Sequence, residues 1–444
     1  MKNIKYIYLV LVLFFAASCE IEERVNPNGP NLGAFTENPS QQDLDLLIAG
    51  LEARSRDGLG AFITATGTIA REHYFFNSSD PTTLETLPGK EGATLTGSEP
   101  QLTGTLFARY QAIKSADFIL NGLDNTSASF TAAEENGYRG VANTFKALML
   151  LDPIGLLNDN GIRIDNSDPE DLGPYVSKAE AFAAIRSILD EGFNQLQSAE
   201  FLFQLSPGFA NFDTPETFAE FNRAVAARAA VRSGDYAGAL TLLSDSFLDL
   251  EGDLAAGPKR VYGNSGFEIQ NPIFKAPQQS GDQYIVNDRM ISDIEAGDTR
   301  ISKFVERNDP VARDGLNGTH ESAVYATATS PIDHIRNEEL VIIFGEASIQ
   351  AGSLDDAVTA FNVLRTAYGL PAYSGAVAAD DLVDEMFYHR TYSLFSEGHL
   401  MFDLRRYDRL SADFLPIDRE GDIIHFEFPI PPFENPAGGS TTGG

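Results

Sequence analysis

Apolar residues recur at helical spacing along most of this chain, and the clearest example lies between residues 335 and 365. Leu340, Ile343, Phe344 and Ala347 stand at positions i, i+3, i+4 and i+7, which is the spacing of one face of a helix. Glutamates occupy the first turn of this stretch, where the helix dipole favours acidic side chains. The pattern predicts a helix whose apolar face packs against a neighbour.

A second helix is predicted directly after the first. Gly352 punctuates the chain, and Ser353 followed three residues later by Asp356 indicates a capping box. Two helices joined by a tight turn form an αα-hairpin. Gly345 in the first helix and Ala357 in the second resemble the tetratricopeptide spacing, in which small side chains let paired helices approach closely.

The same arrangement occurs once more, earlier in the chain. Helical patterns over residues 215–232 and 236–244 flank Gly234, with Ala227 seven residues before it and Ala239 five after it. The later hairpin has its small residues at the same two distances from its turn glycine. The two turns are 118 residues apart, so the repeat is dispersed and does not predict a tandem solenoid.

Helical patterns alternate with two long irregular regions. Further helices are predicted over residues 41–56, 57–70, 106–123, 132–151, 182–196 and 379–395, with Asp152-Pro153 ending the fourth of these. The irregular regions cover about 71–105 and 247–330, and the segment 423–432 indicates a short strand or loop. We predict a mostly α fold, in which tetratricopeptide-like helix pairs carry long irregular insertions and a few short strands. We expect function to lie in the insertions.

Composition narrows the class of protein. Of 444 residues, 43% are hydrophobic, as in folded globular proteins. The formal net charge of −32 argues against nucleic acid as a partner, against electrostatic docking on anionic lipid and against polyanionic ligands. Tryptophan is absent, so any ring that stacks on a ligand must come from Tyr, Phe or His.

The N-terminus has the layout of a secretory signal. Residues 1–18 combine lysines, an apolar run and a small-residue ending. Cys19, the only cysteine, follows directly, which excludes internal disulfides and cysteine-based zinc clusters. The small-small-Cys ending resembles the lipobox of bacterial lipoproteins, in which the cysteine becomes the acylated first mature residue; an ordinary signal peptide is the alternative. Residues 19–40 then indicate a lipid anchor and an extended tether.

Charged residues near the C-terminus form the densest candidate for chemistry. His399 and Asp403 stand four positions apart and could touch on one helical face as an acid–base pair. We favour the alternative that Glu397, His399, Asp403, Arg405 and Arg406 form a buried polar network, because buried charges must be paired.

A metal site is not favoured. The acidic stretch over residues 158–171 invites a calcium interpretation, but its spacing fails the EF-hand template, and a solvated loop is the better interpretation. No His-Glu-x-x-His, Gly-x-Ser-x-Gly or phosphate-loop motif occurs. We expect no catalytic residue, no metal and no cofactor.

Several stretches together resemble the SusD/RagB family of surface lipoproteins, which capture nutrients for TonB-dependent transporters. The matching stretches are Arg139-Gly140 with the helix after it, residues 336–347, Glu397-Gly398-His399 with residues 402–406, and Pro429-Ile430-Pro431 with Glu434-Asn435-Pro436. The third of these resembles the family most, although Leu400 stands where the family usually has Arg.

The resemblance implies a SusD-like domain over residues 41–436, followed by a flexible tail at 437–444. It implies a non-enzymatic protein, lipid-anchored in the outer membrane and surface-exposed, that captures an oligosaccharide or other oligomer for a SusC-like TonB-dependent transporter. It also implies that ligand contacts come from the insertions. There our candidates are Tyr74, Phe75, Tyr284 and Tyr325, because a ring covers an apolar ligand face and a Tyr adds a hydroxyl.

Three alternatives stay open at this point. The lack of Trp leaves room for a peptide-binding member of the same class. The second is a lipid-anchored extracellular hydrolase, whose catalytic carboxylates cannot be identified among 64 acidic residues from the sequence. A helical adaptor without a small ligand is the third.

Overall fold

The computed structural model describes residues 35, 37–77, 79–167, 172–266 and 268–434 of the chain. Helices make up 51% of the structure and strands 8%, which confirms the predicted mostly α fold with a few short strands. The expected signal peptide, Cys19, most of the expected tether and the expected tail lie outside the described residues.

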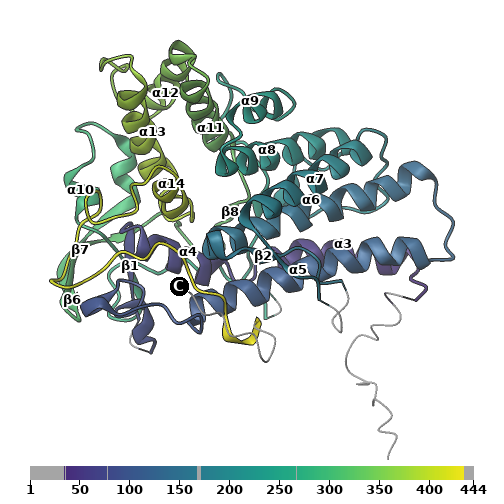
Figure 1. The fold of residues 1–444 in the computed structure, drawn as a ribbon, viewed down its shortest axis with the longest axis horizontal. Coiled ribbons are helices and arrows are strands. Elements are labelled where there is room, and N and C mark those ends of the chain that lie inside the picture. Colours follow the sequence, from purple (N-terminus) through teal and green to yellow (C-terminus); the bar gives the residue numbers. More distant parts are fainter. Residues whose placement is uncertain (1–34, 36, 78, 168–171, 267, 435–444) are drawn as a thin grey trace, which may run out of the picture.

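The helices stack as neighbouring pairs, and a small sheet lies at one side of them (Figure 1). The helices are α3 (Gln41–Arg54), α4 (Leu59–Ile69), α5 (Pro100–Asn125), α6 (Ala132–Leu157), α7 (Lys178–Leu196), α8 (Pro215–Ser233), α9 (Tyr236–Ser244), α10 (Arg289–Ser292), α11 (Asn337–Gln350), α12 (Leu354–Ala367), α13 (Ala379–Ser393) and α14 (Leu400–Arg406). The strands are β1 (His73–Phe76), β2 (Ile162–Arg163), β3 (Tyr175–Val176), β4 (Lys259–Arg260), β5 (Gln283–Val286), β6 (Phe304–Arg313), β7 (Leu316–Ser322) and β8 (Ile332–Asp333).

The two predicted helical hairpins form, as α8–α9 and α11–α12. Their turn glycines, Gly234 and Gly352, both adopt left-handed backbone, with φ of 83° and 80°. A Cβ on Gly345 would stand 2.6 Å from the Phe361 ring, so the small residue does permit close packing of α11 on α12. The predicted capping box is wrong, because the side chain of Ser353 accepts no backbone hydrogen bond at the start of α12.

Helix α6 continues to Leu157, so the prediction that Asp152-Pro153 ends it is wrong. A proline removes only one backbone donor, and tertiary contacts stabilise the turn that follows. Arg405 donates to the carbonyl oxygen of Gly155 at 2.6 Å, and the Phe428 N–H donates to that of Leu156 at 3.0 Å. By length and composition this helix could span a membrane, but 89% of its apolar window is buried in the fold, as in a core helix.

The irregular regions contain more regular structure than predicted. Strands β1, β5, β7 and β6 form an antiparallel sheet in that order, and α5 begins at Pro100 within the first predicted loop. The β6–β7 turn is Asp314-Gly315, in which both residues have positive φ, at 50° and 78°. An Asp-Gly pair is a strong hairpin signal, so the sequence did contain the information needed to predict this hairpin.

The hydrophobic core runs through the helices, and two small clusters cover the sheet. One contains Tyr74, Phe76, Leu84, Ile285 and Leu316. Because alternate side chains of a strand point to opposite faces, this cluster takes one face of β1 and leaves His73 and Phe75 on the other. That face is where two of the predicted binding residues meet.

Candidate functional site

The sheet brings Phe75 and Tyr284 together. The two residues are partners in the β1–β5 ladder, and their rings stack with centroids 4.5 Å apart. Tyr284 is buried, its hydroxyl lies 2.8 Å from Oγ1 of Thr64 in α4, and the His73 ring packs edge-on against it. Tyr284 therefore holds Phe75 in place and has little ring surface left for a ligand.

Phe75 itself is half-buried and has a cation beside it. The Nζ atom of Lys275 lies 5.3 Å from the centroid of the Phe75 ring. A ring fixed from below by a second ring keeps its orientation without a ligand, so little conformational entropy is lost on binding. This arrangement can cover an apolar face of a ligand, while the ammonium group donates hydrogen bonds.

Tyr74 points to the opposite face of β1. It is 1% exposed, and its hydroxyl donates to a carboxylate oxygen of Asp418. Burial is the main cause that raises the pKa of its hydroxyl. The Arg71 charge lowers this pKa, and the Asp418 charge raises it. In this structure Tyr74 packs the sheet and presents no ring face. The sequence predicts residues 71–105 to be irregular and without a strand. It therefore could not tell which face of a strand Tyr74 would take.

Tyr325 stands apart from the Phe75–Tyr284 stack. It is partly buried against the main core, and no ring contact joins it to the other three candidates among the described residues. Burial, and then the charges of Glu397 and Asp333, raise the pKa of its hydroxyl well above the usual value. The structure therefore brings two of the four predicted residues together and separates the other two.

Asp403 and Arg406 of the C-terminal charged cluster join a buried ion network, whereas Arg405 donates only to backbone carbonyl oxygens, and His399 and Asp403 do not pair with each other. His399 Nδ1 lies 3.2 Å from Nη2 of Arg232 in α8. Asp403 instead accepts from Arg390 and Arg406, each at 2.9 Å. Guanidinium groups on other turns and helices satisfy both side chains, so no acid–base pair forms.

Glu346 is the centre of this network. It accepts hydrogen bonds from Arg390 at 2.5 Å and from Arg406 at 2.6 Å, and its side chain is fully buried. Burial opposes its ionisation, but Arg406 and Arg390 overcome that effect and lower the pKa of Glu346 to about 2. The carboxylate is therefore charged at every physiological pH and ties α11, α13 and α14 together.

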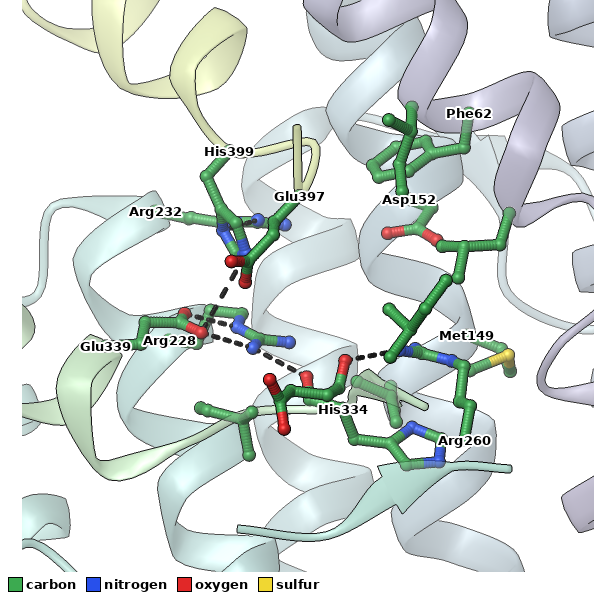
Figure 2. Close-up of a pocket in the computed structure, with 16 residues that line it drawn as sticks. Phe62, Met149, Asp152, Arg228, Arg232, Arg260, His334, Glu339, Glu397 and His399 are labelled. Carbon is green, nitrogen blue, oxygen red and sulfur yellow. Dashed lines mark hydrogen bonds and ion pairs between the residues drawn. The ribbon is translucent and has the colours of Figure 1, made fainter. Parts of the chain in front are cut away.

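A small central cavity lies beside this network (Figure 2). Its volume is about 40 Å³, which is room for about three water molecules and too little for a sugar ring. On its wall, Arg228 donates to both oxygens of Glu339 at 2.6 Å. Burial lowers the pKa of His399 well below its usual value, so this ring is neutral at pH 7. Because a guanidinium can only donate, Nδ1 of His399 accepts from Arg232 and its hydrogen sits on Nε2.

The acidic stretch around residue 160 forms hydrogen bonds within itself and to Glu427. Asp165 accepts from the backbone N–H of Ser167 at 3.0 Å, and the Asn158 amide donates to Glu427 at 2.9 Å. Among the described residues, no group of three or more His, Cys, Asp or Glu side chains is placed to hold a metal ion.

Other exposed groups were not singled out from the sequence. Among the described residues outside the two insertions, four phenylalanines are exposed: Phe107, Phe414, Phe426 and Phe433. A cleft of about 420 Å³ lies beside the second insertion, where Arg56 forms an ion pair with Glu268 at 3.3 Å. No sequence signal separates such rings from core rings, because exposure depends on which neighbours the fold supplies.

Residues 279–431 match the SusD family. No curated protein matches the sequence. Among solved structures, a SusD superfamily protein from Bacteroides vulgatus has a TM-score of 0.65 at 15% identity, covering 89% of this chain and 96% of that one. A SusD-like carbohydrate-binding protein from the same species has a TM-score of 0.64 at 17% identity, covering 82% of each chain. A SusD superfamily protein from Bacteroides thetaiotaomicron has a TM-score of 0.60 at 14% identity, covering 89% of this chain and 95% of that one.

These similarities show a SusD-like fold over 89% of the chain, and the family match covers the part that contains β5 to α14. Proteins of the SusD family are non-catalytic binding proteins located at the outer-membrane surface as lipoproteins. The Glu397-Gly398-His399 stretch and the buried network that follows it lie within the matched residues. Residues 279–431 of this chain are therefore similar to the SusD/RagB family, within a SusD-like fold.

Proposed function

We propose that this protein captures a neutral oligosaccharide at the cell surface and hands it to a SusC-like TonB-dependent transporter. The observation that carries the proposal is the match of residues 279–431 to the SusD family, together with a fold shared with a carbohydrate-binding protein. The ligand lies on the surface around Phe75, where a ring fixed by Tyr284 stands beside Lys275.

The chemistry of this surface suits a sugar. One face of a pyranose ring is apolar and stacks on an aromatic ring, while its hydroxyls accept and donate hydrogen bonds at the edge. The Phe75 ring offers the first contact and the Lys275 ammonium the second. The net charge of −32 keeps polyanionic chains away from the molecule as a whole.

Attachment to the outer membrane depends on Cys19 in this proposal. Residues 1–18 are removed, residues 19–40 anchor and extend the chain, residues 41–436 form the binding domain, and residues 437–444 are a tail. An acyl chain contributes about 0.8 kcal/mol per buried CH₂, so Cys19→Ala releases the protein into the soluble fraction. Retention of this variant in the outer membrane after a salt wash, in cells without the transporter, contradicts the anchor.

The function is tested by calorimetric titration of the mature chain against neutral oligosaccharides, with neutral peptides of similar length in parallel. The proposal expects binding to at least one oligosaccharide, no cleavage of it, and co-purification with a TonB-dependent barrel. Binding to peptides alone makes the protein a peptide-capturing member of the family. Hydrolysis of any oligosaccharide or peptide in the panel contradicts the assignment as a binding protein.

A further inference from the structure

A groove of about 910 Å³ opens between α7, the α8–α9 turn and α14, well separated in the chain from β1 and β5. None of the residues that line it belongs to a strand. The chain as a whole has 64 acidic and 32 basic residues, yet this groove is lined by five cationic and three acidic side chains. The local charge is thus opposite to that of the molecule.

Two arginines on the wall of the groove lack an acidic partner. Arg405 is 7% exposed and donates to the carbonyl oxygens of Phe426 and Gly155, at 3.0 Å and 2.6 Å. Arg232, at the end of α8, stacks on Phe402 and donates to His399. Within the part of the chain that the structure describes, neither guanidinium forms an ion pair with a carboxylate.

The neighbouring Arg406 shows what a structural arginine looks like in this fold. It forms ion pairs with both Glu346 and Asp403, which neutralise its charge. Burial is the main cause that lowers the pKa of Arg232 and Arg405, each to about 10. Both groups nevertheless keep their charge at neutral pH. Carboxylates at longer range favour each cation, Asp403, Asp152 and Glu339 for Arg232 and Glu427 and Asp159 for Arg405, but none forms an ion pair with it; a bound anion would supply that direct contact.

Other features of the groove fit an anion joined to a ring-shaped body. Lys178, in the first turn of α7, stands at the groove, where backbone N–H groups and the helix dipole favour negative charge. Phe182 and the 47% exposed ring of Phe426 supply apolar wall. The volume is that of a small-molecule site. The three acids line the groove as well, and two of them are paired, Asp159 with Lys178 and Asp235 with Arg186.

We propose that this groove is a second binding site, which takes the carboxylate of a small ligand on Arg232 and Arg405. A guanidinium recognises a carboxylate through two parallel hydrogen bonds, and the rings cover the body of the ligand. A carboxylate of this kind belongs either to a sugar acid or to the C-terminus of a short peptide. The site does not depend on the Phe75 surface or on the proposed function.

The experiment titrates the mature chain at low ionic strength with glucuronate and, as a neutral match, glucose. Acetylated dipeptides with a free carboxylate or with a C-terminal amide are titrated in parallel. The site binds at least one carboxylate and neither neutral match. Glucuronate alone identifies a sugar acid as the source, the free dipeptide alone identifies a peptide end, and both together support a general carboxylate site.

Variants then locate the binding. Arg232→Met, which replaces the charge by an apolar chain of similar length, weakens carboxylate binding by about tenfold or more. Lys178→Gln, at a side chain 39% exposed and hence safe for folding, weakens it by about threefold. Lys90→Gln is the matched control, because Lys90 is also a partly exposed, ion-paired lysine but lies outside the groove.

Three results overturn the proposal. The first is equal binding of glucose and glucuronate or of both dipeptides, and the second is equal competition by acetate or chloride, which indicates unspecific anion binding. The third is carboxylate affinity that Lys178→Gln leaves unchanged, which stays decisive if Arg232→Met fails to fold.

Discussion

The helix pairs and the sheet region bury their interiors by different means. Around α11, α13 and α14, charged groups neutralise one another, with Glu346 between Arg390 and Arg406. Around β1 and β5, rings pack on rings, and the outermost ring, Phe75, is half-buried. A neutralised ion network fixes which helices meet and leaves nothing to bind. A stacked ring with one open side is rigid and still able to make contacts, so we propose that the oligosaccharide binds at the sheet region, apart from the groove on the helices.

The largest effect is expected from breaking the ion network. Glu346→Ala leaves two buried arginines with only Asp403 as an acidic partner, and we expect a loss of about 3–5 kcal/mol in the free energy of unfolding. Asp355→Ala, at an exposed acid of α12, costs less than about 1 kcal/mol and serves as the control. Chemical denaturation of both variants measures the difference. Similar midpoints for the two would mean that the network does not hold the helices.

The close approach of α11 and α12 gives the next effect. Gly345→Ala places a Cβ 2.6 Å from the buried Phe361 ring, so we expect a loss of about 1–3 kcal/mol despite the better helix propensity of Ala. Gly50→Ala in α3 has open space around the new methyl group, so the same exchange should stabilise by about 0.5–1 kcal/mol. Thermal unfolding separates the two. A stabilised Gly345→Ala variant would contradict the packing argument.

Buried histidines make stability depend on pH in both regions. Burial lowers the pKa of five of the six histidines, to about 3 for His73 in β1. A lowered pKa of a histidine means that the unfolded chain binds the proton more readily, so stability is complete above pH 6.5 and falls as the pH drops toward 3. Glu72, whose pKa burial raises to about 8, acts in the opposite sense and gains stability on acidification.

Burial also raises the pKa of Glu52, Asp117 and Glu397, which act in the same sense as Glu72. We expect the five histidines to outweigh these carboxyl groups, so that the free energy of unfolding falls between pH 7 and pH 5. His73→Phe should reduce the loss in the free energy of unfolding at pH 5 by up to about 2 kcal/mol, since a shift of one pKa unit corresponds to about 1.4 kcal/mol. Glu72→Gln should steepen the fall. An unchanged slope in His73→Phe would show that this ring is not held neutral by burial.

How much of this was predictable depends on whether the signal is local. The hairpins around Gly234 and Gly352 follow from spacing and turn chemistry, which are local properties. The continuation of α6 past Pro153 depends on Arg405, about 250 positions away, and is invisible to a local pattern. The same holds for the partners of His399 and Asp403, which come from α8 and α13.

The candidate site shows the same division. Aromatic residues in the insertions were recognisable, but which of them keep an open side depends on the sheet that was not predicted. Tyr74 and Phe75 are neighbours in sequence and lie on opposite faces of β1. Arg232 and Arg405 could not be singled out from the sequence, because only the folded structure shows which arginines lack a carboxylate partner.

The central claim, that the oligosaccharide binds at the sheet region, is tested most directly by calorimetric titration of Phe75→Ala. The titrant is the oligosaccharide that the parent protein binds. Phe107→Ala, at a 66% exposed ring on the helix α5, is the matched control, and Tyr284→Phe keeps the supporting ring while removing its hydroxyl. We predict that Phe75→Ala weakens binding by about 1–3 kcal/mol, while Phe107→Ala and Tyr284→Phe bind as the parent does. Unchanged affinity in Phe75→Ala, or a loss confined to Phe107→Ala, would contradict the account.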